Sequence, residues 1–405
     1  MDLKRLEKRV LLASPTMHGE EQEYIKEAFD RNWIAPLGFN CDGFENEMAA
    51  YLKEDVYPFA TVSGTSALHL AVKLAGVKPG DIVLCSDMTF AATVNPVSYE
   101  GGIQVFIDSE RETWNMDPGA LERGFQKYPD ANVVLLAHLY GTPSKMDEII
   151  AVCKKHNAVL IEDAAEALSA EYKGIKCGTF GDYNALSFNG NKIITTSGGG
   201  MIITKDVEKR NKALFWSTQT REPAPWYQHE ELGYNYRMSN IVAGIGRGQL
   251  RHLEEHRELK EQIYRRYEEG LKGYPVRMNP YLKESRPNFW LSCLTVNPEA
   301  MCEQIRTDKT TIWKHESGKT CPDEIAQKLL EMNIETRPIW KPMHLQPYYA
   351  GRDFISTGVS EDIFNRGICL PSDIKMMVEE QNTVIEVIKS SSQDMVVCMR
   401  VNHYI

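Results

Sequence analysis

The sequence lacks long apolar runs and an excess of positive charge. No apolar stretch approaches the ~20 residues that a membrane-spanning helix needs, and residues 1–9 carry charges where a signal peptide has an apolar core. With a net charge of −10, the chain as a whole repels nucleic acid and anionic membranes, so an anionic substrate requires a local basic pocket. We therefore expect a cytoplasmic protein with no membrane and no nucleic-acid partner.

Metal-binding and dinucleotide-binding motifs are missing as well. None of the nine cysteines belongs to a Cys-x-x-Cys pair or has a histidine at zinc-ligand spacing, which predicts reduced, mostly buried thiols and no metal site. A nicotinamide-dependent sugar oxidoreductase needs Gly-x-Gly-x-x-Gly after its first strand, and Gly64-Thr65-Ser66 does not supply it.

Between residues 57 and 205 the sequence alternates short apolar runs with helical stretches. The strand candidates are residues 82–85, 105–108, 133–137, 159–161, 185–187 and 201–204. This alternation predicts an α/β fold with a mostly parallel sheet covered on both faces, whose ligands lie beyond the carboxyl ends of the strands. Residues 64–66, residues 89–90 and Asp163 fall at such ends.

The second part of the chain has a different pattern. Leu250, Leu253, Ile263 and Leu271 form one apolar stripe, which predicts a single long helix over residues 240–271. A strand over 289–296 and helices over 321–332 and 374–389 complete a smaller α+β domain. We assign residues 1–250, with an N-terminal helical segment, to the large domain and residues 251–405, with the linking helix, to the small one. The tail 390–405 has no assigned role.

Three motifs carry chemistry. Lys192 lies in the loop Ser187-Phe-Asn-Gly-Asn-Lys192, bordered by glycines, where a lysine has room to form a Schiff base. Asp163 follows the apolar run 158–161 and offers a rigid seat for a pyridinium nitrogen. The turn 63–66 joins a strand to a helix, and its free backbone N–H groups suit a phosphate. Together they predict pyridoxal phosphate as the cofactor.

Each motif has a simpler interpretation when taken alone. A loop lysine such as Lys192 is commonly just solvated, Asp163 is in a position typical of a helix N-cap, and the turn 63–66 needs no ligand to cap a helix. Their order along the chain favours the cofactor site.

At these motifs the chain resembles the DegT/DnrJ/EryC1/StrS family of sugar-nucleotide aminotransferases, over residues 12–390. The resemblance implies fold type I, the architecture of aspartate aminotransferase. It is greatest for members that transfer an amino group from L-glutamate to C4 of a UDP-linked 4-keto-6-deoxy-N-acetylhexosamine in bacterial glycan and nonulosonic acid pathways. The segments that carry this closer match are 32–38, 163–166, 187–192, 233–237 and 337–344.

The resemblance implies a role for each site residue. Lys192 holds the cofactor and moves the proton, Asp163 pairs with the ring nitrogen, and Glu166 lies near the phenolic oxygen. The cofactor-binding residues implied are Gly64, Thr65, Ser66, Phe90, Asp163, Glu166, Ser187, Lys192 and Asn235. Of these, Phe90 stacks on the ring, Ser187 binds the phosphate, and Asn235 reaches the phosphate across the interface of a homodimer.

The nucleotide-sugar site is implied at Trp33, Ile34 and Ala35 near the entrance and at Lys341 and His344. Arg237 either meets a substrate carboxylate or braces its loop. Four alternatives stay open: a dTDP-4-keto-6-deoxy sugar as substrate, a dehydratase of the same family, a non-catalytic binding protein and an oxidoreductase. The dehydratases carry His where this chain has Lys192.

Overall fold

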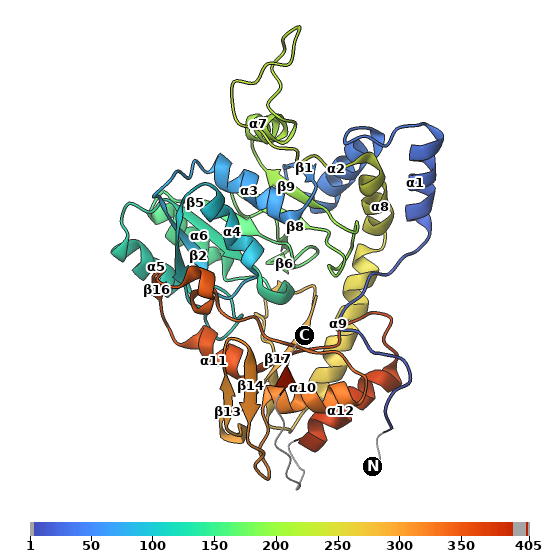
Figure 1. Ribbon diagram of the computed structural model, residues 1–405, viewed down its shortest axis with the longest axis vertical. Helices are drawn as coiled ribbons and strands as arrows, with labels where there is room; N and C mark the ends of the chain where they lie inside the picture. The colour runs from blue at the N-terminus through green and yellow to red at the C-terminus, as the bar shows by residue number, and fades with distance from the viewer. Residues whose placement is uncertain (1–3, 392–401, 404–405) are drawn as a thin grey trace.

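The computed structural model describes residues 4–391 and 402–403; Cys398 and most of the tail lie outside them. Its centre is an eight-stranded sheet in the order β1-β9-β8-β5-β4-β2-β3-β16 (Figure 1). The strands are β1 (Tyr57–Thr61), β2 (Ile82–Ser86), β3 (Ile103–Ile107), β4 (Val133–Ala137), β5 (Val159–Asp163), β8 (Tyr183–Ser187), β9 (Gly200–Thr204) and β16 (Phe354–Ile355). β9 runs antiparallel to both its neighbours, whereas the other pairings are parallel. The predicted mostly parallel sheet is confirmed.

Both faces of the sheet carry apolar side chains, because helices cover the strands on both faces. In β2, Val83 and Cys85 belong to one hydrophobic cluster and Leu84 to another, and Val134 and Leu135 of β4 divide in the same way. The helices that accompany the strands are α3 (Gly64–Leu74), α4 (Ala91–Tyr99), α5 (Pro118–Lys127), α6 (Met146–Lys155) and α7 (Val207–Ser217). Alternate residues of each strand therefore pack under different helices, as in other parallel α/β sheets.

The predicted single helix over 240–271 is wrong, because two helices occupy this stretch. α8 (Asn240–Leu250) packs on α1 (Glu20–Asp30) and α2 (Phe39–Leu52), whereas α9 (Leu253–Gly270) packs on the C-terminal elements. The break falls at residues 251–252, where His252 has φ −105 and ψ 4. Each helix follows its own packing partners, and α9 leads to the second part of the molecule (Figure 1).

The C-terminal part is built on a four-stranded sheet, β10 (Val276–Met278), β12 (Ser292–Val296), β17 (Gly367–Leu370) and β15 (Arg337–Pro338). The predicted helices appear as α10 (Pro322–Glu331) and α12 (Val378–Ser391), and α11 (Val359–Arg366) is additional. The strand predicted from residue 289 begins only at Ser292, because Phe289 has a left-handed φ of 52°.

Short elements complete the chain. They are β6 (Glu171–Tyr172), β7 (Ile175–Lys176), β11 (Ser285–Arg286), β13 (Gln304–Arg306), β14 (Thr310–Trp313), β18 (Asn402–His403), η1 (Leu139–Gly141), η2 (Pro298–Ala300), η3 (Met343–Leu345) and η4 (Pro347–Tyr349). In the described part of the chain, no helix combines the length and apolarity needed to cross a membrane.

Two connections cross the division predicted at residue 250. Val10 forms a parallel bridge with Ile334, and Ser372 donates its N–H to the Leu12 carbonyl, so the N-terminal segment lies on the C-terminal part. In the other direction, β16 extends the large sheet beside β3. These crossings hold the two parts together on either side of the carboxyl ends of the strands.

Candidate active site

A cavity of about 910 Å³ lies at the carboxyl ends of the large-sheet strands, where the C-terminal part covers them. Eight of the residues predicted for the site line it: Gly64, Thr65, Phe90, Asp163, Glu166, Ser187, Lys192 and Lys341. Trp290, Arg337 and Trp340 from the C-terminal part also face it. Residues that are distant in the sequence thus meet where the sheet pattern predicted a ligand site.

Asp163 is the last residue of β5 and is buried at the floor of the cavity. Its Oδ2 accepts a hydrogen bond from Thr93 Oγ1 at 2.7 Å, and its Oδ1 accepts one from the Ala165 N–H at 2.9 Å. Burial raises the pKa of Asp163, although both hydrogen bonds favour the ionised form. A cationic partner in the cavity would offset the cost of that burial.

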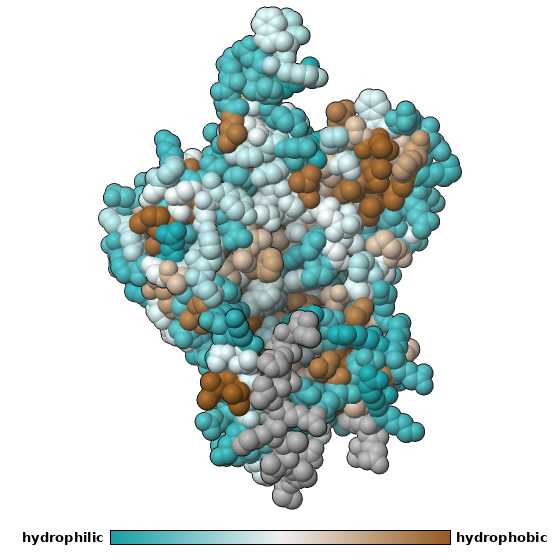
Figure 2. Space-filling model, viewed as in Figure 1, coloured by the Kyte–Doolittle hydropathy of each residue, from teal (hydrophilic) through white to brown (hydrophobic). Residues whose placement is uncertain are grey.

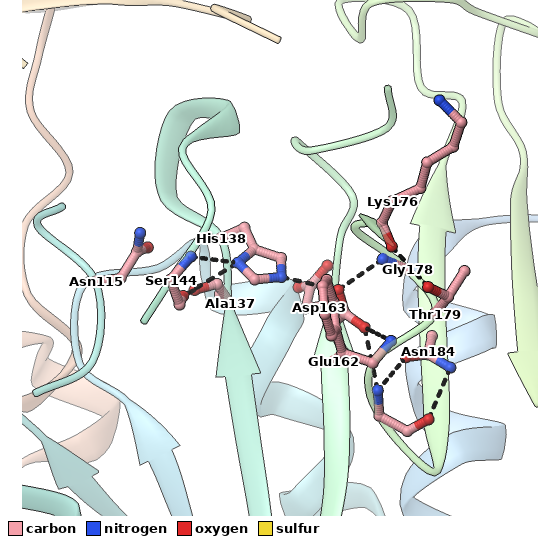
Figure 3. A network of polar contacts seen from close by, with 12 residues as sticks. Asn115, Ala137, His138, Ser144, Glu162, Asp163, Lys176, Gly178, Thr179 and Asn184 are labelled. Carbon is pink, nitrogen blue, oxygen red and sulfur yellow. Dashed lines mark hydrogen bonds and ion pairs between the residues drawn. The ribbon is translucent and has the colours of Figure 1, made fainter. Parts of the chain in front are cut away.

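A buried polar network around Glu162, the residue before Asp163, fixes the end of this strand (Figure 3). Glu162 accepts hydrogen bonds from the backbone N–H groups of Gly178, Phe180 and Gly181, at 2.6, 2.8 and 3.2 Å. His138 Nε2 lies 2.8 Å from Glu162 Oε1, while its Nδ1 accepts from the Ser144 N–H at 3.1 Å, so Nε2 carries the proton.

This network also reaches Asp163 through the backbone, because the His138 N–H bonds the Asp163 carbonyl at 3.1 Å. Sequence analysis missed the pair of Glu162 and His138. The available signal was a glutamate inside an apolar strand, since a buried carboxylate requires donors around it.

Lys192 is held inside the cavity and is not a solvated loop lysine. Its Nζ lies 3.2 Å from Glu166 Oε1 and 4.0 Å from the centre of the Trp290 ring. Glu166 also accepts a hydrogen bond from the Tyr140 N–H at 2.8 Å. Burial raises the pKa of Glu166 to about 7 against the opposing effect of Lys192, so this carboxyl exchanges a proton near neutral pH.

Trp290 braces the loop of the lysine, and sequence analysis missed it. Its Nε1 donates to the Asn191 carbonyl at 2.7 Å, directly before Lys192. Two residues earlier, Asn288 Nδ2 donates to the Glu166 carbonyl at 2.7 Å. The left-handed φ of Phe289 between them marks backbone strain, which persists where the surroundings enforce it. The apolar run 289–296 gave no signal for this role because it also fits a core strand.

The turn before α3 is shaped for close approach of another group. A Cβ on Gly64 would lie 2.9 Å from Ser187 Cβ, and one on Gly200 would overlap the Ser63 carbonyl, so β8 and β9 press against this turn. Ser63 Oγ caps the helix by accepting from the Ser66 N–H at 3.0 Å. Gly64 and Thr65 line the cavity, and as the first residues of a helix their backbone N–H groups have no acceptor within the helix. Ser66 is buried behind them, with its Oγ 2.7 Å from Ser63 Oγ.

Six predicted residues lie away from this cavity. Trp33, Ile34, Ala35 and Asn235 are exposed, and none of them lines it. Arg237 is buried, pairs with Glu45 and lies 4.6 Å over the Phe59 ring, which favours the bracing alternative over a substrate contact.

His344, the sixth, does not line the cavity and packs instead on Asp87, which follows β2, and on Phe354 of β16. Its Nδ1 lies 2.8 Å from Asp87 Oδ2, and its ring stacks on Phe354 at 3.7 Å. Burial opposes protonation, but Asp87 outweighs it and raises the pKa of His344. The histidine thereby fixes the segment that carries Lys341.

The match to known proteins covers nearly the whole chain. Residues 15–389 match the DegT/DnrJ/EryC1/StrS aminotransferase family. The chain belongs to this family. The putative pyridoxal phosphate-dependent aminotransferase EpsN of Bacillus subtilis is 46% identical over 95% of this chain and 96% of its own length. GDP-perosamine synthase of Escherichia coli O157:H7 is 34% identical over 96% of this chain and 100% of its own.

Solved structures of the family share the fold. The putative sugar aminotransferase Spr1654 of Streptococcus pneumoniae, in its PLP form, has a TM-score of 0.84 at 23% identity, covering 95% of this chain and 99% of its own. DesV of S. venezuelae has a TM-score of 0.81 at 25% identity, covering 95% and 100%. The predicted family and its fold type I architecture are confirmed.

Proposed function

We propose that this protein is a pyridoxal phosphate-dependent aminotransferase that moves the amino group of L-glutamate to C4 of a UDP-linked 4-keto-6-deoxy-N-acetylhexosamine. The products are 2-oxoglutarate and the UDP-linked 4-amino-4,6-dideoxy sugar, for bacterial glycan or nonulosonic acid biosynthesis. The observation that carries the proposal is the floor of the cavity, where Lys192 meets Glu166 and the buried Asp163.

The residues at the cavity fit this cofactor. The turn at Gly64 and Thr65 offers backbone N–H groups and a hydroxyl to a phosphate, and Ser187 lies against it. The carboxyl of Asp163 is positioned for a ring nitrogen, and Phe90, at the start of α4, offers an exposed aromatic face. When bound, pyridoxal phosphate supplies an electron sink for the charge left as an amino donor loses its α-proton.

The protein's own groups handle the protons. Lys192 Nζ accepts the proton from the donor α-carbon and returns it during transfer, and the Trp290 ring and Glu166 hold that amine in place. With the cofactor bound, Asp163 would hold a proton on its ring nitrogen through a charge-assisted hydrogen bond. Glu166, with a pKa of about 7, could keep a proton to share with the cofactor's phenolic oxygen, which would relieve the repulsion between two negative groups.

The substrate assignment rests on the cavity rim and on segments of sequence. A cavity of about 910 Å³ has room for a nucleotide sugar, and Arg337 and Lys341 offer positive charge to a diphosphate at its edge. The segments 32–38 and 337–344 and the presence of Glu166 resemble UDP-N-acetylhexosamine enzymes. Since a relative at 34% identity is named GDP-perosamine synthase, a GDP-linked sugar is the first competitor.

A panel of substrates tests the assignment. With L-glutamate as donor, the products formed from UDP-, dTDP- and GDP-linked 4-keto-6-deoxy sugars are identified by mass spectrometry and their kcat/KM values compared. We expect the UDP-2-acetamido sugar to have the highest kcat/KM. A higher kcat/KM for a dTDP- or GDP-linked sugar would contradict the proposed substrate. If no amino group were transferred to any of these sugars, the proposed aminotransferase activity would be wrong.

We further propose a cytoplasmic homodimer in which each active site takes residues from both chains. Its described cysteines are free thiols, which suits a reducing compartment. Asn235, Trp33 and Ile34 lie outside their own chain's cavity, where they are available to a partner. Apolar side chains gather over α1 and α8, and the segment 218–235 projects beyond α7 (Figures 1 and 2). Both features suit an interface between copies.

Subunit mixing tests the shared site. Lys192→Ala and Asn235→Ala chains, each inactive alone, are combined, and subunit exchange is verified with differently tagged chains. Activity should return, because one of the two sites in a mixed dimer then has every group. No recovery after verified exchange would mean that each site is built within one chain.

A further inference from the structure

Three imidazoles gather behind the loop of the catalytic lysine. His18 directly precedes Gly19 and α1, while His252 and His256 lie four residues apart at the start of α9 and so share one face of it. His18 Nε2 lies 2.7 Å from His256 Nε2, and the His18 ring stacks on the His252 ring with 3.6 Å between their centres. Ligand atoms of His18, His252 and Glu255 all lie within 4.8 Å of one another.

The orientation of His256 leaves a lone pair directed at this cluster. Its Nδ1 lies 2.8 Å from the Ile193 carbonyl and must therefore carry the proton. Its Nε2 is then an acceptor, directed at His18.

Acidic groups surround the imidazoles. His252 Nδ1 lies 3.1 Å from Glu255 Oε2 and its Nε2 lies 3.2 Å from Glu20 Oε1. By contrast, the buried group of His138, Glu162 and Cys177 is already filled by backbone donors to Glu162 and by Ser144. The His18 cluster differs because its ligand atoms come from side chains alone and Glu255 leaves it open to solvent.

We propose that His18, His252 and Glu255 bind one divalent transition-metal ion of the zinc class, with His256 hydrogen-bonded to His18 beside the site. Imidazole nitrogens suit zinc, nickel and copper and not magnesium. The hydrogen bond between His18 Nε2 and His256 Nε2, at 2.7 Å, holds the His18 ring at the edge of this site.

The ion would join three segments that are distant in sequence. His18 anchors the chain entering α1 and His252 anchors the start of α9, while His256, hydrogen-bonded to His18, holds the carbonyl of Ile193 beside Lys192. Because these ligands do not line the substrate cavity, the role of the metal is to fix the lysine loop and not to contact the sugar. The cysteine spacing gave no indication of such a site, because its ligands are histidines and a glutamate.

Calorimetric titration of the chelator-treated holoenzyme with ZnCl2 tests the site directly. We expect saturable binding of one Zn²⁺ per chain, no binding of Mg²⁺, and a loss of affinity of tenfold or more in His18→Ala and His252→Asn. His229→Ala, at an exposed histidine of the projecting segment, is the matched control and should bind as the wild type does.

Thermal unfolding provides a second readout that does not depend on activity. Zn²⁺ should raise the Tm of the wild type and of His229→Ala, because it binds the folded state, and should leave the Tm of His18→Ala unchanged. If His18→Ala does not fold, His252→Asn replaces it in this comparison. Absence of saturable Zn²⁺ binding to the wild type, or equal affinity in the His18 and His252 variants, would overturn the proposal.

Discussion

The floor and the rim of the cavity are built in different ways. Asp163 and Glu166 are buried, the Lys192 side chain is 12% exposed, and each of the three is held by at least two partners. Arg337 on the rim has a side chain 60% exposed and pairs with Glu335, while Lys341 pairs with Asp308, itself 68% exposed. Exposed ion pairs contribute only about 0–1 kcal/mol, so the rim can exchange these partners for a ligand. The floor is suited to fixed chemistry and the rim to recognition.

The largest effect on turnover should come from removing the amine of Lys192 at the floor of the cavity. Lys192→Ala should lower turnover by about 10³-fold or more, because the variant loses both the covalent attachment and the proton-transfer base. The absorbance of the lysine-bound cofactor should vanish, while circular dichroism stays that of the wild type. Normal turnover without added amine would contradict the role of Lys192.

Asp163→Asn should have the second largest effect on the rate, after Lys192→Ala. A charge-assisted hydrogen bond contributes about 1.5–3 kcal/mol. Its loss should therefore slow α-proton transfer by about tenfold to 100-fold. The amide keeps one acceptor, which can still take the Ala165 N–H bond, while its NH2 group faces Thr93 Oγ1 as a donor, so the shape of the floor is kept. Single-turnover kinetics with deuterated glutamate isolate this step, and a near-normal rate would exclude Asp163 as the partner of the ring nitrogen.

Glu166→Gln should change the pH dependence of stability in the cofactor-free protein. Burial raises the Glu166 pKa from 4.5 to about 7, so the folded state keeps a proton that the unfolded state releases. Stability is therefore fully present below pH 4.5 and falls as pH rises toward 7, by up to about 1.4 kcal/mol per pH unit.

The wild type should consequently lose on the order of 3 kcal/mol more than Glu166→Gln over this pH range. Urea unfolding at several pH values measures the difference. The amide remains an acceptor for the Tyr140 N–H, so packing is preserved. Parallel stability curves for the two proteins would show that folding leaves the Glu166 pKa at its ordinary value.

The sequence predicted the floor well and the rim poorly, for physical reasons. Lys192, Asp163 and Gly64 lie at strand ends, and the strand pattern itself specifies that such ends converge. Trp290 and the break between α8 and α9 depend on packing against partners distant in sequence, which a local apolar pattern does not encode. For the same reason, His344 matched a nucleotide-binding segment but packs on Asp87 and Phe354.

The smallest predicted effect concerns the rim. Lys341→Ala should raise the KM for the nucleotide sugar by about three- to tenfold, since one screened contact to a diphosphate contributes about 1 kcal/mol, and should leave kcat nearly unchanged. Because the contact is exposed to solvent, added salt should raise the wild-type KM and reduce the difference between the two proteins.

Steady-state kinetics at two salt concentrations measure both effects. Lys309→Ala serves as the matched control, because this neighbouring lysine is exposed and does not line the cavity. A fall in kcat with unchanged KM in Lys341→Ala would assign the residue to the chemistry of the floor. An equal rise in KM for both variants would mean that the general field of the surface, and not a specific contact, recognises the diphosphate.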